Sequence, residues 1–109
     1  VPFDIARVYY IYNVPTNAER GGHAHYDLEQ VMIALSGSFR VRTHDGSQWT
    51  EHWLHNPCEA LYISNMTWRE MDRFSQGAGC AVLASNRYDE TDYIRDYETF
   101  LAKIEAQQQ

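Results

Sequence analysis

Short extended segments separated by turn-forming residues fill most of this chain, and they constrain its fold more than any other feature. The clearest turn is Asp45-Gly46, a dipeptide typical of two-residue hairpins, which lies between the segments 38–43 and 48–54. In the first segment apolar and basic side chains alternate, as they do in a strand that buries one face. The pattern therefore predicts antiparallel strands joined by tight turns.

Similar segments recur on both sides of this hairpin, each rich in β-branched or aromatic residues and bounded by turn-forming residues. They cover residues 3–12, 29–35, 61–63, 68–74 and 80–84. From about Thr91 the apolar residues adopt helical spacing, which predicts one helix over about 92–106 capped by Thr91 or Asp92. Strands over about 3–85 followed by one C-terminal helix indicate an all-β barrel or double-sheet jelly roll.

Length and charge limit the classes of function. The 109 residues suffice for one domain, 1–109, and no internal repeat or linker divides them. With 15 acidic and 9 basic residues, the formal charge of −6 disfavours a general binder of nucleic acid or of membrane surfaces. There is no apolar run of about 18 residues and no signal peptide, so we expect a cytoplasmic protein. We expect Cys58 and Cys80 to be buried free thiols.

The segment 20–25 (RGGHAH), followed by Glu29, is the strongest candidate site. In an extended segment the two-residue period places His23 and His25 on the same face. The glycines before them allow a sharp turn and a close approach of the backbone to a ligand. Because imidazole titrates near neutral pH, two imidazoles that face a cavity form either a proton-transfer device or half of a metal site.

His-x-His followed by Glu resembles the first motif of the cupin superfamily, in which these residues bind a divalent metal ion with one more His from a later strand. The comparable later stretch of this chain has Arg69 instead. A guanidinium is permanently protonated, so it cannot bind a metal ion and repels one. We therefore favour a metal-free site without a cofactor. A metal-dependent cupin enzyme that uses His23, His25 and Glu29 is the alternative.

A more specific resemblance covers nearly the whole chain. It rests on PFDIARVYYIY at 2–12, RGGHAH at 20–25, LEQ at 28–30, LSGS at 35–38, LYI at 61–63 and LASNRYDETDYIRDY at 83–97. Together these segments resemble the sugar 3,4-ketoisomerase family, the WxcM-like cupins. The resemblance implies a cupin jelly roll (double-stranded β-helix), a homodimer and no cofactor. It also implies action on dTDP-4-keto-6-deoxyglucose, for deoxyamino sugars of surface polysaccharides such as O-antigen lipopolysaccharide and S-layer glycans.

The implied activity is an isomerisation that moves the ketone of this sugar from C4 to C3 by proton transfer through an enediolate. His23 and His25 match the family's active-site histidines. We take His25 as the base and His23 as the group that donates to, or orients, the developing oxyanion. A tyrosine of the preceding strand lines the site in this family. Tyr10 and Tyr12 share one face, and both are candidates.

A diphosphate needs cations, and Arg suits bidentate contact with phosphate. The candidates are Arg7, Arg20 and Arg40, with Arg69 as a further substrate-binding residue at a position where the family often has His. Trp68 is the candidate for stacking on the thymine ring. Because that later histidine is missing, a non-catalytic sugar-nucleotide-binding cupin is a second alternative.

Overall fold

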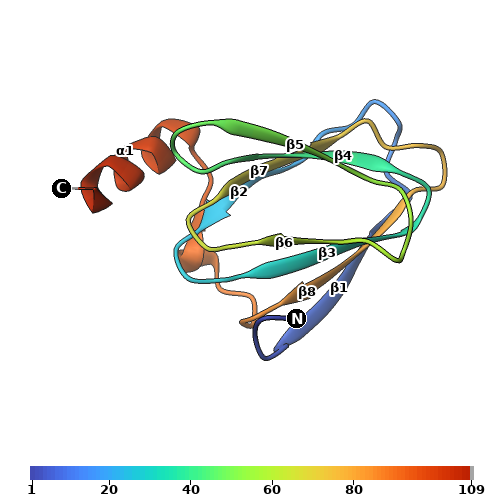
Figure 1. The fold of residues 1–109 in the computed structure, drawn as a ribbon, viewed down its shortest axis with the longest axis horizontal. Coiled ribbons are helices and arrows are strands. Elements are labelled where there is room, and N and C mark those ends of the chain that lie inside the picture. Colours follow the sequence, from blue (N-terminus) through green and yellow to red (C-terminus); the bar gives the residue numbers. More distant parts are fainter. Residues whose placement is uncertain (109) are drawn as a thin grey trace.

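Two antiparallel sheets packed face to face form the body of the protein, in a computed structural model that describes residues 1–108 (Figure 1). The elements are β1 (Arg7–Tyr12), β2 (Arg20–His25), β3 (Gln30–Ser36), β4 (Phe39–His44), β5 (Trp49–Leu54), β6 (Ala60–Ile63), β7 (Trp68–Asp72), β8 (Gly79–Ala84), β9 (Tyr93–Ile94) and α1 (Tyr97–Gln107). The first sheet has the strand order β1-β8-β3-β6 and the second β5-β4-β7-β2-β9. Strands distant in the sequence are thus neighbours, and the predicted all-β jelly roll with one C-terminal helix is confirmed.

The hairpin between β4 and β5 turns over residues 45–48, a loop longer than two residues that begins with the predicted Asp45-Gly46. His44 and Trp49 form the last pair of the ladder. Asp45 Oδ1 accepts hydrogen bonds from the amides of Ser47 and Gln48 at 2.8 and 3.0 Å. Gly46 has φ +99°, a conformation that side-chain-bearing residues rarely adopt. The short side chain of Asp45 and the freedom of Gly46 together reverse the chain here.

The core lies between the sheets and is built from every second residue of the strands, because alternate side chains point inward. Met32 and Val82 of the first sheet meet Phe39, Val41 and Met71 of the second, and all five are buried. Each such side chain contributes about 1.5–3 kcal/mol through removal from water. The core holds both sheets in fixed positions, so side chains that project between them at one end are held in place.

The two cysteines differ in exposure. Cys80 is buried, as expected, whereas Cys58 is exposed, and both are free thiols. The prediction for Cys58 was wrong because this residue belongs to the turn between β5 and β6. There its amide donates to Asn56 Oδ1 at 2.9 Å.

The C-terminal segment departs from the prediction at its start. The helix begins at Tyr97 rather than near residue 92, because Asp96 is its N-cap and accepts a hydrogen bond from the amide of Thr99. Residues Glu90–Asp92 form a 3-10 turn, and β9 then pairs with β2. Aromatic residues with apparent helical spacing therefore belong partly to a strand.

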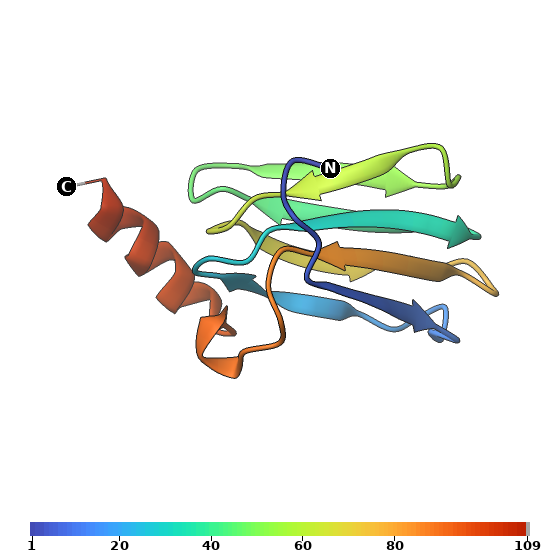
Figure 2. The same cartoon turned by 90° about the horizontal axis from the view of Figure 1, so that it is seen from below.

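Helix α1 packs against the outer face of the second sheet at one end of the molecule (Figures 1 and 2). Phe100 and Ile104 of the helix are buried against Ala24 of β2 and Trp68 of β7. Within the described residues, no helix is long and apolar enough to cross a membrane. The helix thus covers the outer face of β2 and β7. The side chains on the inner face of these two strands project into the sandwich.

Candidate functional site

Strand β2 directs His23 and His25 toward the inside of the sandwich. The pairing of β2 with β7 shifts register between Arg20 and His23, an irregularity of the kind that re-aims side chains next to active sites. Gly21 lies at this shift with φ +77°, and a Cβ there would meet Met71 Sδ at an ordinary 3.6 Å. Backbone conformation, rather than space, is therefore what requires glycine at this position.

The two imidazoles lie against each other and against one tyrosine. The ring centroids of His23 and His25 are 4.9 Å apart, edge to face. Tyr93 of β9 packs on both rings, with centroid distances of 5.0 and 4.3 Å. Sequence reasoning missed Tyr93, because its spacing matched the apolar face of the predicted helix. The pairing of His25 with Tyr93 across β2 and β9 brings it to the site.

A guanidinium lies next to the histidines. Arg69 of β7 pairs with His23 across the strands and is completely buried. Its Nη1 donates to Gln30 Oε1, and its Nη2 donates to the carbonyl of Thr67 at 3.2 Å. Gln30 in turn donates to the hydroxyl of Tyr9 at 3.0 Å. No carboxylate lies within ion-pair distance of Arg69 in residues 1–108, so the charge is held by neutral groups alone.

Burial and this cation keep the histidines uncharged. Burial is the larger cause and Arg69 the next, and together they lower the pKa of His23 to about 2 and of His25 to about 3. Burial also lowers the pKa of Arg69, but only to about 10, so it stays protonated at neutral pH. The cavity therefore offers two neutral proton acceptors and one cation, an arrangement suited to a group that becomes negatively charged.

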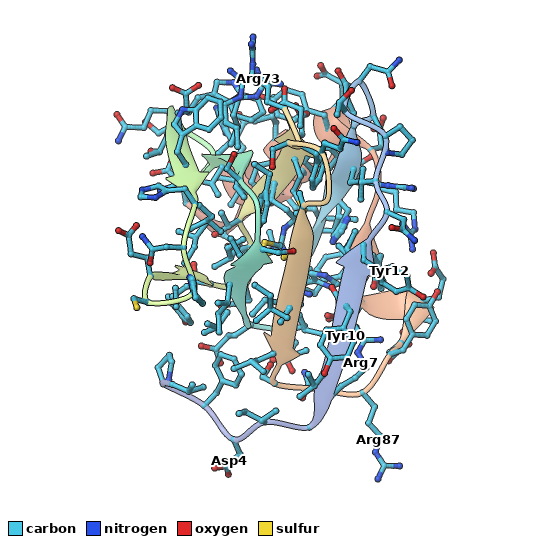
Figure 3. All side chains as sticks on the ribbon, turned by 90° about the vertical axis from the view of Figure 1, so that its right-hand side faces the viewer. Asp4, Arg7, Tyr10, Tyr12, Arg73 and Arg87 are labelled. Atoms are coloured by element: carbon cyan, nitrogen blue, oxygen red, sulfur yellow. The ribbon has the colours of Figure 1, made fainter. Side chains whose placement is uncertain are left out.

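The tyrosine that β1 contributes to the interior is Tyr9. Tyr10 and Tyr12, the sequence candidates, are 63% and 70% exposed and follow one another along the outward face of β1 (Figure 3). The structure therefore does not bring them to the histidines. Both faces of β1 are rich in large side chains, so alternation alone did not identify the inner one. The hydrogen bond to Gln30 and the burial that raises the pKa of Tyr9 mark it as the interior residue.

Arg7 also belongs to the inner face of β1. Its guanidinium carbon lies 4.8 Å from the ring centroid of Tyr9 and 5.6 Å from that of Tyr88. Its Nε atom is buried and has no hydrogen-bond partner in the described part of the chain. Arg7 also contributes to the low pKa of His25, so its charge acts on the histidine cluster.

The remaining sequence candidates lie on the outer face of the second sheet. Arg40 is paired with Asp72 and Glu51. Trp68 packs under α1, and its indole N–H donates a hydrogen bond to the carboxylate of Glu70. Arg20 is exposed and borders a hollow of about 310 Å³ on this outer face. None of the three is brought to the histidines.

The metal-binding alternative lacks a ligand set. In the described part of the chain, no three His, Cys, Asp or Glu side chains come close enough together to hold a metal ion. Glu29 accepts a hydrogen bond from the hydroxyl of Tyr62 instead of joining His23 and His25. Arg69, a cation that repels a metal ion, pairs with His23 on the neighbouring strand. The geometry therefore does not support a metal centre built from the residues of the cupin motif.

Asp92 is a further residue that sequence reasoning assigned elsewhere, as a possible helix cap. Its Oδ2 atom lies 3.3 Å from Nδ1 of His25. The same carboxylate accepts hydrogen bonds from the amides of Asp27 and Leu28 at 2.9 and 3.1 Å. Asp92 thus connects His25 to the loop that follows it.

Comparison with known proteins gives concordant matches. The family model described as FdtA: WxcM-like, C-terminal, matches residues 1–105. A TDP-4-oxo-6-deoxy-alpha-D-glucose-3,4-oxoisomerase of Aneurinibacillus thermoaerophilus is 46% identical over 112 aligned residues, which cover 100% of this chain and 81% of that protein.

Two solved structures are also similar to this chain in sequence and in fold. A 3,4-ketoisomerase from Helicobacter canadensis superposes with a TM-score of 0.94 at 45% identity, covering 96% of this chain and 79% of that one. QdtA, a sugar 3,4-ketoisomerase from Thermoanaerobacterium thermosaccharolyticum in complex with TDP, gives a TM-score of 0.95 at 43% identity, covering 98% and 78%. The matches extend over nearly the whole chain, including the strands that hold the histidine cluster.

Proposed function

Because this chain belongs to the FdtA family of WxcM-like C-terminal domains, we propose that it is a sugar-nucleotide 3,4-ketoisomerase. It moves the keto group of a dTDP-4-keto-6-deoxyhexose from C4 to C3, a step in making deoxyamino sugars. The observation that supports this most directly is the pair of neutral imidazoles beside the buried guanidinium of Arg69. Proton acceptors next to a fixed positive charge are what enolisation of a ketone requires.

The first step removes the proton on C3, which is acidic because the resulting carbanion delocalises into the C4 carbonyl. We assign this proton to His23, which is partly exposed, whereas His25 is completely buried and further from an entering sugar. This order reverses the one expected from the sequence. The imidazolium of His23 then delivers the proton to C4. One histidine therefore removes the proton from C3 and adds it to C4.

The second requirement is a proton that moves between the two oxygens. After the C3 proton leaves, the hydroxyl proton must pass from O3 to O4 before the C3 carbonyl forms. We assign this transfer to His25, with Tyr9 as a hydroxyl donor nearby and Arg69 as the cation that stabilises the enediolate. Each well-placed donor or cation contributes on the order of 3 kcal/mol to such a transition state. No electrons leave the sugar, so the reaction is balanced without a redox partner.

The diphosphate of the substrate is assigned to Arg7. Its Nε atom has no protein partner in the described residues and its ring contacts hold it beside the histidines. A guanidinium in this state can make bidentate contact with phosphate oxygens. Arg20, Arg40 and Trp68 face the other side of the second sheet and receive no role in substrate binding.

The function is tested by incubating the protein with dTDP-4-keto-6-deoxyglucose in D2O and following the sugar by NMR. We expect deuterium at C3 of recovered substrate together with a 3-keto product. Binding of the nucleotide sugar without deuterium uptake would instead indicate a sugar-nucleotide-binding cupin and would overturn the proposal.

The division of labour between the histidines is tested by two matched variants. His23→Asn should abolish deuterium uptake at C3, because no base then reaches the carbon. His25→Asn should lower turnover at least about a hundredfold yet retain uptake at C3, because only the transfer between oxygens is slowed. The opposite pattern would restore His25 as the carbon base.

We also propose that the protein acts as a homodimer in the cytoplasm. The outward face of the first sheet exposes several large apolar side chains and α1 does not cover it (Figure 2). These side chains are Val8, Tyr10, Tyr12, Leu35 and Tyr62. Apolar patches of this kind mark protein interfaces, and a second copy is the partner that the family relationship favours. Two free cysteines, one of them exposed, suit a reducing compartment.

A further inference from the structure

The surroundings of His25 single out one carboxylate. Asp92 Oδ2 lies 3.3 Å from His25 Nδ1, and no other carboxylate lies within 4.0 Å of either histidine in the described residues. Both ring nitrogens of His25 are buried, and neither makes a hydrogen bond of good geometry to a protein group described here. Among residues 1–108, Asp92 is therefore the carboxylate on which the ring can rely.

The carboxylate of Asp92 is itself held in place. The amide of Asp27 donates to Oδ1 and the amide of Leu28 donates to Oδ2. The carbonyl of Asp92 accepts a hydrogen bond from the amide of Tyr26 at 3.0 Å. Its side chain is only 16% exposed. A group fixed at three points keeps its distance to the imidazole while substrate binds and leaves.

The other charged and titratable groups around His25 cannot replace this contact. Arg69 on β7 and Arg7 on β1 are cations, and they disfavour a charged imidazole. Arg95 is paired with Glu90. The rings of His23 and Tyr93 pack against His25 at 4.9 and 4.3 Å. Of the described neighbours, Asp92 is therefore the group placed to accept a hydrogen bond from Nδ1–H.

We propose that Asp92 is a positioning residue, which holds His25 as its Nδ1–H tautomer and so leaves Nε2 as the proton acceptor that faces the substrate. In a neutral imidazole the hydrogen bond made by one nitrogen decides which nitrogen bears the proton. A proton on Nδ1 lies next to the nearest carboxylate, at an Nδ1–Oδ2 distance of 3.3 Å, and Nε2 then keeps its lone pair. The proposal rests on the proposed function for the catalytic use of that lone pair, but the tautomer itself exists without substrate.

The tautomer is measured on the ligand-free wild-type protein, labelled with 15N, by long-range 1H–15N correlation of the imidazole ring. We expect a protonated Nδ1 and an unprotonated Nε2 for His25 at neutral pH. In Asp92→Asn the preference for Nδ1–H should be lost, because the amide can donate to Nδ1. Asp89→Asn is the matched control, since Asp89 caps the same 3-10 turn through Thr91 and does not touch a histidine. This control should leave the tautomer and the activity unchanged.

Kinetics provide the second readout. Asp92→Asn should lower kcat by at least about tenfold with little change in KM, as when a carboxylate behind a catalytic histidine is lost. An Nε2–H tautomer in the wild type, or an unchanged tautomer in folded Asp92→Asn, would overturn the proposal. If Asp92→Asn does not fold, the wild-type spectrum still decides the question. Absence of deuterium uptake by the wild type would refute the isomerase function while leaving the tautomer assignment standing.

Discussion

At the scale of single residues, the charge of Arg69 controls the chemistry of the cavity. A buried guanidinium without a carboxylate is expensive to desolvate, and such groups are retained mainly where a function uses them. Here neutral acceptors from Gln30 and Thr67 hold the charge without neutralising it. The positive potential is therefore available to an enediolate oxygen. After burial, which is the larger cause, it is also the second cause that lowers the pKa of both imidazoles.

Replacing Arg69 by Met should affect catalysis and folding stability in different ways. We expect Arg69→Met to lower kcat at least about a hundredfold, since a positioned charge contributes roughly 3 kcal/mol to an anionic transition state. The pKa values of His23 and His25 should rise, because the repulsion from the cation is gone, although burial still holds them below the usual value. Steady-state kinetics and NMR titration of the imidazoles measure the two effects.

Stability should respond differently, because Arg69→Met removes the desolvation cost of a buried charge that no carboxylate offsets. Arg42→Met is the control: Arg42 is paired with Glu70 on the outer face of the same sheet, so its loss should leave kcat unchanged. Equal losses of activity in both variants would show that Arg69 acts through general structure and not through its charge.

At the scale of elements, the sequence predicts hairpins and extended segments more reliably than a short strand that depends on a distant partner. The hairpin at Asp45-Gly46 and the extended RGGHAH segment were predictable, because turn chemistry and the two-residue period are local properties. Strand β9 was not predictable, because a two-residue strand exists only through its pairing with β2. The contributions of Tyr93 and Asp92 depend on that pairing, so both were missed as site residues.

Tyr9 was absent from the sequence candidates on β1, which were Tyr10 and Tyr12, for a different reason. Strand β1 has large side chains on both faces, because its outward face is apolar as well. Alternation identifies two sets of residues on such a strand but not which set faces the core. Only contacts with another element, here the hydrogen bond from Gln30, identify the inner set.

The glycine at the irregular part of β2 makes a testable element-scale prediction. Gly21→Ala should lower the free energy of unfolding by about 1 kcal/mol, because alanine resists the left-handed region. It should also lower kcat, because the backbone there aims His23. Gly77→Ala is a close match, since Gly77 has φ +74° and a Cβ would meet nothing within 4 Å. Chemical denaturation and kinetics should show similar destabilisation in both variants but lost activity only in Gly21→Ala.

At the scale of the whole molecule, the buried histidines couple folding to pH. Their pKa values of about 2 and about 3 in the folded state lie below the ordinary value near 6.5 of an unfolded chain. Between these values the unfolded state binds more protons, so stability is complete above pH ~6.5 and decreases as pH falls. This window lies above the range in which the carboxylates titrate.

We therefore expect the free energy of unfolding to fall by about 2–3 kcal/mol between pH 6 and pH 5, from the two histidines together. Urea denaturation at both pH values measures the change. In the double variant His23→Gln/His25→Gln most of this dependence should disappear, since glutamine does not titrate. A wild type that is equally stable at the two pH values would mean that the imidazoles are not buried in the neutral form.

The final prediction concerns assembly. The outward face of the first sheet exposes 51% of Val8, 63% of Tyr10 and 70% of Tyr12, three neighbours on one strand. A second copy that covers these side chains removes their exposed apolar surface from water, which favours association at roughly 25 cal/mol per Å² before the entropic cost of binding is subtracted. We expect a dimer by sedimentation equilibrium at micromolar concentration, and a folded monomer for Val8→Glu/Tyr10→Glu. Trp53→Glu, on β5 of the opposite sheet and 47% exposed, should remain dimeric. A monomeric wild type would contradict the dimer itself. A dimer broken only by Trp53→Glu would place the interface on the second sheet.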